Sequence, residues 1–172
     1  MLDADGLNAF AGGLDAIAAR KAATILTPHA GELGRLLERP SEEVSAHRLA
    51  AAREAALAAG AIVVLKGDDT IVVDGRRGAF PTHGVGKAPH VAVNALSAPA
   101  LATAGTGDVL SGMTAALLAR GLEPFAAACA AVLAHARAGR EAARRIGAAE
   151  SVIATDLIEA IPAGMLPGSS VE

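Results

Sequence analysis

A single aspartate follows glycine and threonine in the segment Gly105-Thr106-Gly107-Asp108, directly before an apolar stretch that predicts a helix over residues 109–120. Free backbone N–H groups and the positive end of a helix dipole favour phosphate at such a place. A carboxylate adds a negative charge that a simple phosphate site would not need. The arrangement is explained if Asp108 takes a proton from a hydroxyl group that attacks phosphate. The structural alternative is an ordinary first-turn acid, but the glycines before it are costly unless something binds there.

A second polar group follows the apolar run 61–65, which predicts a strand buried on both faces of a parallel sheet. It consists of Lys66, Gly67, Asp68, Asp69 and Thr70. A lysine at the carboxyl end of a strand points toward the crevice where α/β sheets bind ligands. We expect contact with nucleotide phosphate or ribose; a polar hairpin turn explains the same residues equally well.

A third polar group, Thr27-Pro28-His29-Ala30-Gly31-Glu32, follows a predicted strand at residues 23–26. His29 could hydrogen-bond a substrate, and Glu32 could hold Mg²⁺ through water. Taken alone, the two residues are better explained as the start of a helix, with His29 in the turn and Glu32 as a first-turn acid. Because three such loops converge on one edge of a sheet, we favour the functional interpretation.

The elements that position these loops alternate along the chain. Strands are predicted at 23–26, 61–65 and 70–73, with a hairpin back through Ala79 and Phe80 and a short strand near 91–93. Helices are predicted at 14–21, 32–37, 109–120, 124–146 and 155–161, the last capped by Thr155. A longer helix is expected from Pro40, capped by Ser41 and stopped by Gly60. Strands that alternate with helices indicate an α/β layer fold.

Composition excludes several function classes. The 172 residues are 52% hydrophobic and 19% charged, which indicates one folded domain. A net charge of -3 and an aromatic content of 2% argue against nucleic-acid binding. The single cysteine, Cys129, excludes a disulfide framework, and no apolar run reaches the ~20 residues of a membrane span. We therefore expect a cytoplasmic protein with no membrane and no nucleic-acid partner.

Two standard nucleotide motifs do not fit. A Walker A loop ending at Gly86-Lys87 would need glycine at Pro81 and a hydroxyl at Ala88. A dinucleotide fingerprint would need a third glycine at Leu110. The anion loop at 105–108 is therefore of another kind.

Taken together, the motifs resemble those of the NAD(P)H-hydrate dehydratases, members of the ribokinase-like superfamily. The resemblance rests on Thr27-Pro28-His29-x-Gly31-Glu32, Lys66-Gly67-x-x-Thr70 and Gly105-Thr106-Gly107-Asp108-Val109-Leu110, with the opening 3–8 and the late 155–158 in support. It implies a three-layer α/β/α fold with a mainly parallel sheet. The family's fold begins roughly 100 residues before Asp3, a length that fits the rest of a full α/β domain. We therefore expect residues 1–162 to be a C-terminal portion of one such domain, incomplete at the N-terminus, and 163–172 to be a flexible tail.

The resemblance implies a carbon–oxygen lyase that repairs hydrated NADH or NADPH. ADP or ATP, with Mg²⁺, would phosphorylate the ring hydroxyl, and elimination of phosphate would restore the nicotinamide. Asp108 would be the base and contact the hydrate, and His29 would bind the hydrate. The nucleotide would be bound by Lys66, Gly67, Asp68, Asp69, Thr70, Gly105, Thr106 and Gly107.

Further expectations concern partners and alternatives. We expect a homo-oligomer, with a tetramer as one form, and a functional link to an NAD(P)H-hydrate epimerase. An ATP-dependent kinase of a small alcohol, of the hydroxymethylpyrimidine or thiazole kinase type, would share a glycine-rich loop with aspartate. A nucleotide-binding fragment without catalysis is the third possibility.

Overall fold

The computed structural model describes residues 1–76 and 89–166. The predicted hairpin through Ala79 and Phe80 lies outside these residues. The elements, in chain order, are α1 Asp5–Asn8, α2 Leu14–Ala18, β1 Ile25–Leu26, α3 Ala30–Leu37, α4 Ser41–Ala46, α5 Arg48–Ala59, β2 Ile62–Leu65, β3 Thr70–Asp74, β4 His90–Asn94, the 3₁₀ helix Pro99–Leu101, α6 Thr106–Ala119, α7 Pro124–Ile146, the 3₁₀ helix Ala149–Ser151 and α8 Ala154–Gly164.

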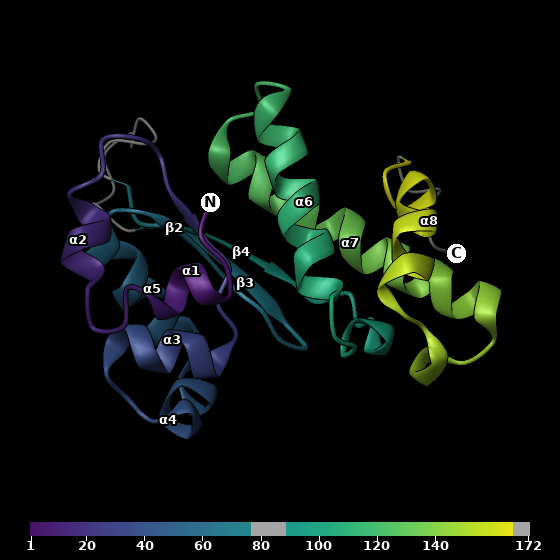
Figure 1. Ribbon diagram of the computed structural model, residues 1–172, viewed down its shortest axis with the longest axis horizontal. Coiled ribbons are helices and arrows are strands. Elements are labelled where there is room, and N and C mark those ends of the chain that lie inside the picture. The colour runs from purple at the N-terminus through teal and green to yellow at the C-terminus, as the bar shows by residue number, and fades with distance from the viewer. Residues whose placement is uncertain (77–88, 167–172) are drawn as a thin grey trace.

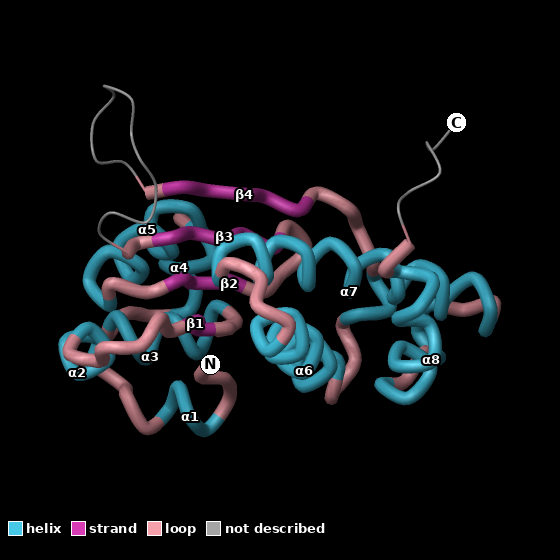
Figure 2. Tube along the Cα trace, turned by 90° about the horizontal axis from the view of Figure 1, so that it is seen from above, coloured by secondary structure: helices cyan, strands magenta, loops and turns pink. Residues whose placement is uncertain are grey.

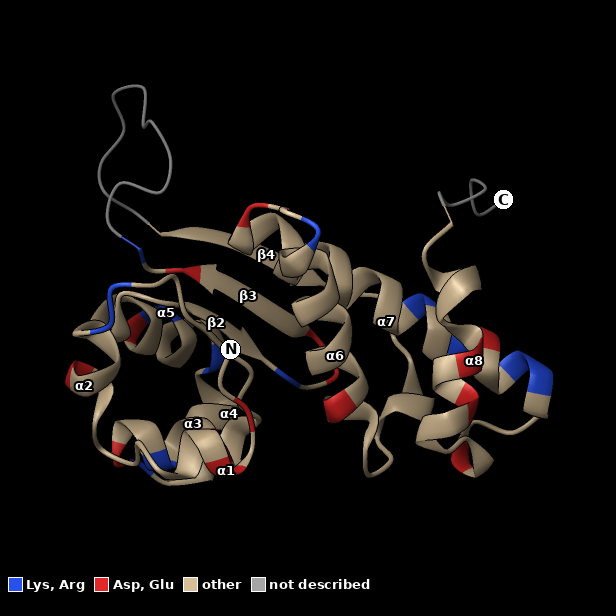
Figure 3. Cartoon of the chain, turned by 45° about the horizontal axis from the view of Figure 1, so that its top comes forward, with Lys and Arg blue, Asp and Glu red and all other residues tan. Residues whose placement is uncertain are grey.

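The described strands form one sheet in the order β1-β2-β3-β4, and Figure 2 shows these strands side by side in that order. Helices α1 to α5 cover one face, and α6 and α7 lie on the other, with α8 packed on α7 (Figure 1). The middle of the sheet carries no charged residues, which gather near strand ends and on helices (Figure 3). The α/β class and the layered arrangement predicted from the sequence are confirmed.

Side-chain alternation along the strands divides the core into two clusters. Ile62 and Val64 of β2 pack toward α6 and α7, whereas Val63 and Leu65 pack toward α3 and α5. Both faces of β2 are therefore buried, as its continuous apolar run indicates. Alanines dominate the helix faces that meet the sheet, so the backbones of helix and strand come close together. A chain nearly free of aromatic residues can build a core in this way.

The expected mainly parallel sheet is wrong for the described strands, because the sheet is mixed. β1 pairs with β2 in parallel, but β2 with β3 and β3 with β4 are antiparallel. The physical reason is the short turn at 66–69: two strands joined by so few residues can only run in opposite directions. The predicted short strand near 91–93 is confirmed as β4.

Three helix boundaries also differ from the sequence-based expectations. The helix expected from Pro40 to Gly60 is divided at His47, whose φ of -130° and ψ of 42° are not helical. Neither Ser41 nor Thr155 acts as an N-cap; Asp156 instead accepts a hydrogen bond from the Ile153 N–H. Helix α8 continues through Pro162 to Gly164, two residues into the segment expected to be a tail.

Helix α6 begins at Thr106, three residues before the expected start. Gly105 adopts a left-handed conformation with φ of 84°, which favours glycine. The Thr106 hydroxyl donates to the carbonyls of Leu101 and Thr103, at 2.7 and 2.8 Å. Asp108 is therefore inside the first helical turn. Among the described residues, no helix combines the length and apolar character needed to cross a membrane.

Candidate functional site

A cavity of about 480 Å³ lies where the β2–β3 turn meets the beginning of α6. It brings together six of the residues that the sequence predicts for the nucleotide: Lys66, Gly67, Asp68, Thr70, Thr106 and Gly107. Its other lining residues are Asn94, Leu96, Ser97, Ala98, Pro99, Leu101, Ala102, Leu110, Val132, His135 and Ala136. Gly105, Asp69, Asp108, His29 and Glu32 lie outside this lining.

The first turn of α6 presents both donors and a free carboxylate. The N–H groups of Gly107 and Asp108 have no acceptor among the described residues, as is usual in a first helical turn. The Asp108 side chain is exposed and has no hydrogen-bond or ion-pair partner within the described part of the chain. This helix end can therefore bind an anion while Asp108 remains free to accept a proton.

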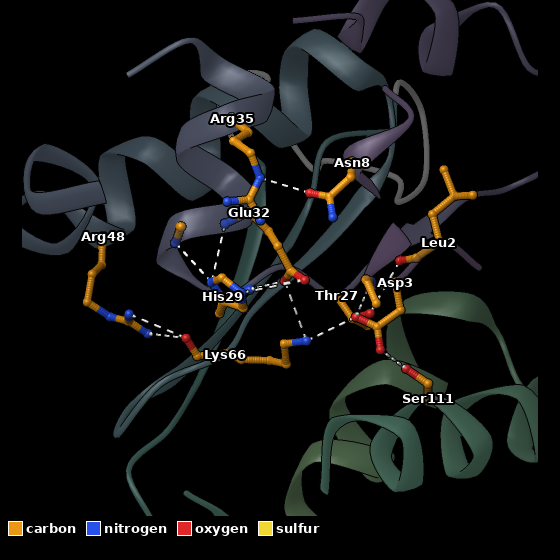
Figure 4. A network of polar contacts seen from close by, with 12 residues as sticks. Leu2, Asp3, Asn8, Thr27, His29, Glu32, Arg35, Arg48, Lys66 and Ser111 are labelled. Atoms are coloured by element: carbon orange, nitrogen blue, oxygen red, sulfur yellow. Dashed lines mark hydrogen bonds and ion pairs between the residues drawn. The ribbon is translucent and has the colours of Figure 1, made fainter. Parts of the chain in front are cut away.

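Lys66 lies between the carboxylates of Asp3 and Glu32 and the first turn of α6. Its Nζ lies 3.0 Å from Asp3 Oδ1 and 3.6 Å from Glu32 Oε2. A Cβ added to Gly107 would lie 3.5 Å from the same Nζ, so the ammonium group is next to the start of α6. The lysine is therefore held by two carboxylates at the edge of the anion site (Figure 4).

Asp3 is the residue at this site that sequence reasoning did not predict. Its Oδ2 accepts a hydrogen bond of 2.6 Å from Ser111 of α6, while Oδ1 faces Lys66. Burial opposes ionisation of Asp3, but hydrogen bonds from Ser111 and Lys66 outweigh it and hold the pKa below its usual range. Pairing of Leu2 with Leu26 beside β1 brings Asp3 to this position. In the sequence, Asp3 stands directly after an apolar residue and opens the segment 3–8 that supports the family resemblance, but neither observation gave it a role in the site.

His29 and Glu32 form a capping box at the start of α3. The Glu32 carboxylate accepts from the His29 N–H at 2.8 Å, and His29 Nδ1 accepts from the N–H groups of Gly31 and Glu32 at 3.0 and 3.2 Å. Glu32 is thus committed to the main chain and to Lys66. The described residues contain no group of three or more His, Cys, Asp or Glu side chains that could hold a metal ion. The His29 N–H and Lys66 already contact the Glu32 carboxylate, and binding of Mg²⁺ through water at Glu32 stays a prediction.

The capping contacts assign the tautomer of neutral His29. Backbone N–H groups can only donate, so Nδ1 must be the acceptor and the proton must be on Nε2. Nε2 lies 3.6 Å from Glu32 Oε1, and the side chain is 54% exposed. His29 therefore offers a hydrogen-bond donor to the solvent-facing side of the site and is not available as a base through Nδ1.

We predict that His29→Asn keeps the stability of the protein close to its original value, whereas His29→Ala lowers it by about 1 kcal/mol. The Asn side chain can still accept from the N–H groups of α3, but it has no group in the place of Nε2. Urea unfolding measures the difference, and nitrogen NMR of the imidazole should find the proton of the neutral ring on Nε2. The exposed His47→Asn is the control; a proton on Nδ1 would contradict the assignment.

His135 of α7 stabilises the anion loop at residues 105–108 through the backbone of Thr106. Its Nε2 lies 2.8 Å from the Thr106 carbonyl, to which it can only donate. Burial lowers the pKa of His135, with the hydrogen bond to Thr106 opposing that shift, so the ring stays neutral. Sequence patterns do not predict this contact, because its two residues are 29 positions apart in the chain.

Comparison with known proteins shows the family of this chain. A family model described as NAD(P)H-hydrate dehydratase matches residues 1–163. The chain is 42% identical over 166 residues to a bifunctional NAD(P)H-hydrate repair enzyme from Salinibacter ruber, covering 94% of this chain and 27% of that protein. It is 43% identical to the Gloeobacter violaceus enzyme of the same description, covering 97% of this chain and 29% of the relative. The chain thus spans between a quarter and a third of the length of these relatives.

Solved structures show the same fold. An ADP/ATP-dependent NAD(P)H-hydrate dehydratase from Bacillus subtilis, co-crystallised with ATP/Mg²⁺, superposes with a TM-score of 0.72 at 29% identity, over 84% of this chain and 48% of that one. A ribokinase-like superfamily protein from Enterococcus faecalis gives a TM-score of 0.69 at 25% identity, over 95% and 51%. By sequence and by fold, the chain belongs to the NAD(P)H-hydrate dehydratase family of ribokinase-like proteins.

Proposed function

We propose that the protein is a carbon–oxygen lyase that uses ADP or ATP to dehydrate hydrated NADH or NADPH. The observation that carries the proposal is the cavity that joins the Lys66–Thr70 turn to the first turn of α6, with the free Asp108 carboxylate on that same turn. A phosphate group there would meet unpaired N–H groups and the Lys66 ammonium. A hydroxyl group beside it would meet a base.

In the proposed reaction, Asp108 takes the proton of the ring hydroxyl while that oxygen attacks the terminal phosphorus of the nucleotide. A bond from oxygen to phosphorus forms, and the bond to the AMP or ADP leaving group breaks. The Gly105–Gly107 amides stabilise the charge on the transferring phosphoryl group. Loss of phosphate then breaks the carbon–oxygen bond, and the neighbouring ring carbon loses a proton to solvent, so that the electrons of its C–H bond form the restored double bond.

The remaining residues have supporting roles in this proposal. Lys66, Gly67, Asp68, Asp69 and Thr70 form the nucleotide side of the site. His29 donates its Nε2 proton to an oxygen or amide of the hydrate. Mg²⁺ would come with the nucleotide phosphates, because Glu32 is occupied by Lys66 and the main chain.

The substrate in this proposal, NAD(P)H hydrate, is taken from the descriptions of the relatives. The Bacillus subtilis structure is described as an ADP/ATP-dependent NAD(P)H-hydrate dehydratase, and the curated relatives as bifunctional repair enzymes. These descriptions favour the dehydratase over the small-alcohol kinase. A homo-oligomer and a functional link with an NAD(P)H-hydrate epimerase are part of the same proposal.

The test is to incubate the protein with hydrated NADH or NADPH and either nucleotide. We expect the absorbance of the reduced nicotinamide to return, with one phosphate released for each molecule restored, and no return without nucleotide. Phosphate transfer to hydroxymethylpyrimidine or a thiazole alcohol, without repair of the hydrate, would favour the kinase instead. Nucleotide binding in calorimetry without either reaction would identify a binding protein and overturn the proposal.

A further inference from the structure

The turn that follows β2 is stabilised by contacts with one arginine. Arg48, the first residue of α5, donates from Nη2 to the carbonyl of Asp69 at 2.8 Å and to that of Leu65 at 3.3 Å. Both terminal nitrogens lie 3.5 Å from the Lys66 carbonyl, which makes weaker contacts (Figure 4). Nε lies 2.8 Å from Asp69 Oδ1, although not in the alignment of a hydrogen bond. One guanidinium thus contacts the end of β2 at Leu65 and the turn at Lys66 and Asp69.

This position is unfavourable for an arginine on its own. A cation in the first turn of a helix faces the positive end of the helix dipole, and α5 begins at Arg48. The contacts with the turn offset that cost, since carbonyl oxygens and a carboxylate surround the guanidinium. A lysine could not replace it, because its ammonium lacks the planar fork that reaches several acceptors at once.

Gly67 fits against the flat guanidinium. A Cβ added at this glycine would lie 2.5 Å from Arg48 Nη2 and 2.8 Å from the central carbon of the guanidinium. The φ angle of Gly67 is not in the left-handed region, so the backbone conformation does not require glycine. A side chain at this position would instead displace the Arg48 guanidinium.

We propose that Arg48 is a positioning residue for nucleotide binding: it fixes the backbone of the Lys66–Asp69 turn without contacting the nucleotide itself. Arg48 is not among the residues that line the cavity, whereas Lys66, Gly67 and Asp68 are. The effect of Arg48 on nucleotide binding rests on the proposed function. Its effect on the turn does not.

A double-mutant cycle tests this role. Arg48→Ala should weaken ADP binding roughly tenfold in calorimetry, and Gly67→Ala should do the same because the new methyl group displaces the guanidinium. Once Arg48 is absent, Gly67→Ala has nothing to displace, so the double variant should bind no more weakly than Arg48→Ala alone. Arg53→Ala is the matched control: it removes an exposed arginine from the same helix, with no partner among the described residues.

Nitrogen NMR relaxation of the backbone tests the positioning without any nucleotide. The order parameters of the N–H groups of residues 67–69 should fall from about 0.85, the value of a rigid backbone, to below about 0.6 in Arg48→Ala, with no change in Arg53→Ala. Unchanged order parameters would overturn the positioning role even if ADP affinity fell. Losses that multiply in the double variant would overturn the link between Arg48 and Gly67. If the unsubstituted protein binds no nucleotide while the relaxation result holds, the proposed function fails and the positioning of the turn stands.

Discussion

Asp108→Asn is expected to lower the rate of hydrate repair by about 10²- to 10⁴-fold, the usual contribution of a positioned general base. The amide has the size and shape of the carboxylate but cannot take the proton of an attacking hydroxyl group. Nucleotide affinity should stay the same or rise slightly, because one negative charge next to the anion site is removed. Recovery of reduced nicotinamide absorbance measures the rate, and calorimetry with ADP measures affinity.

A control must separate this effect from the change in charge at a helix end. Asp108 lies in the first turn of α6, where an acid stabilises the helix by about 0.3–1 kcal/mol. Asp15→Asn makes the same substitution at an exposed first-turn acid of α2, outside the site, and should leave the rate unchanged. If Asp108→Asn retains more than a tenth of the original rate, Asp108 is not the base.

Local sequence patterns were sufficient to predict the three loops as neighbours, and the contact between Lys66 and Glu32 places the third loop beside the other two. Lys66 follows a strand whose apolar run could only be central, and Gly107 lies in a glycine-containing loop directly before a predicted helix, so both were expected at one sheet edge. The cavity brings them together. The choice between a nucleotide site and a simple hairpin turn could not be made for Lys66–Thr70, because both interpretations need the same polar, glycine-containing sequence.

The residues that hold the site in place could not be predicted, because their contacts join distant parts of the chain. Asp3 meets Ser111 across 108 residues, and Arg48 meets Asp69 across 21. The break at His47 separates the buried Val44 from Arg48. It contains neither glycine nor proline, so the sequence does not predict it. These side chains act through tertiary contacts, which leave no periodicity or spacing in the sequence.

Gly75→Ala is expected to destabilise the protein by about 3 kcal/mol or more, or to prevent it from folding. A Cβ at Gly75 would lie 2.0 Å from the carbonyl oxygen of Ala56 and 2.1 Å from its carbonyl carbon. These are backbone atoms in the last turn of α5, so no side-chain rotation can relieve the overlap. Ala56 itself is fully buried against the sheet.

The segment around Gly75 is held in place by several polar contacts. Its N–H donates to the Ala61 carbonyl at 2.9 Å, and the flanking Asp74 and Arg76 are joined by an ion pair of 2.6 Å. Arg76 also pairs with Glu123, which caps α7. Relief of the overlap would therefore require α5 to move away from the sheet. Arg48, at the start of the same helix, would move with it. A loss of 3 kcal/mol corresponds to roughly 6–12 °C in melting temperature for a domain of this size.

Gly112→Ala is the matched control, because a Cβ there has nothing within 4 Å and would lie inside α6. Alanine is the better helix former by about 0.5–1 kcal/mol, so this variant should melt at the same temperature or slightly higher. Thermal and urea unfolding of both variants, with the yield of folded protein, distinguish the cases. A Gly75→Ala protein that melts within about 2 °C of the unsubstituted one would show that α5 and the end of β3 are not in direct backbone contact.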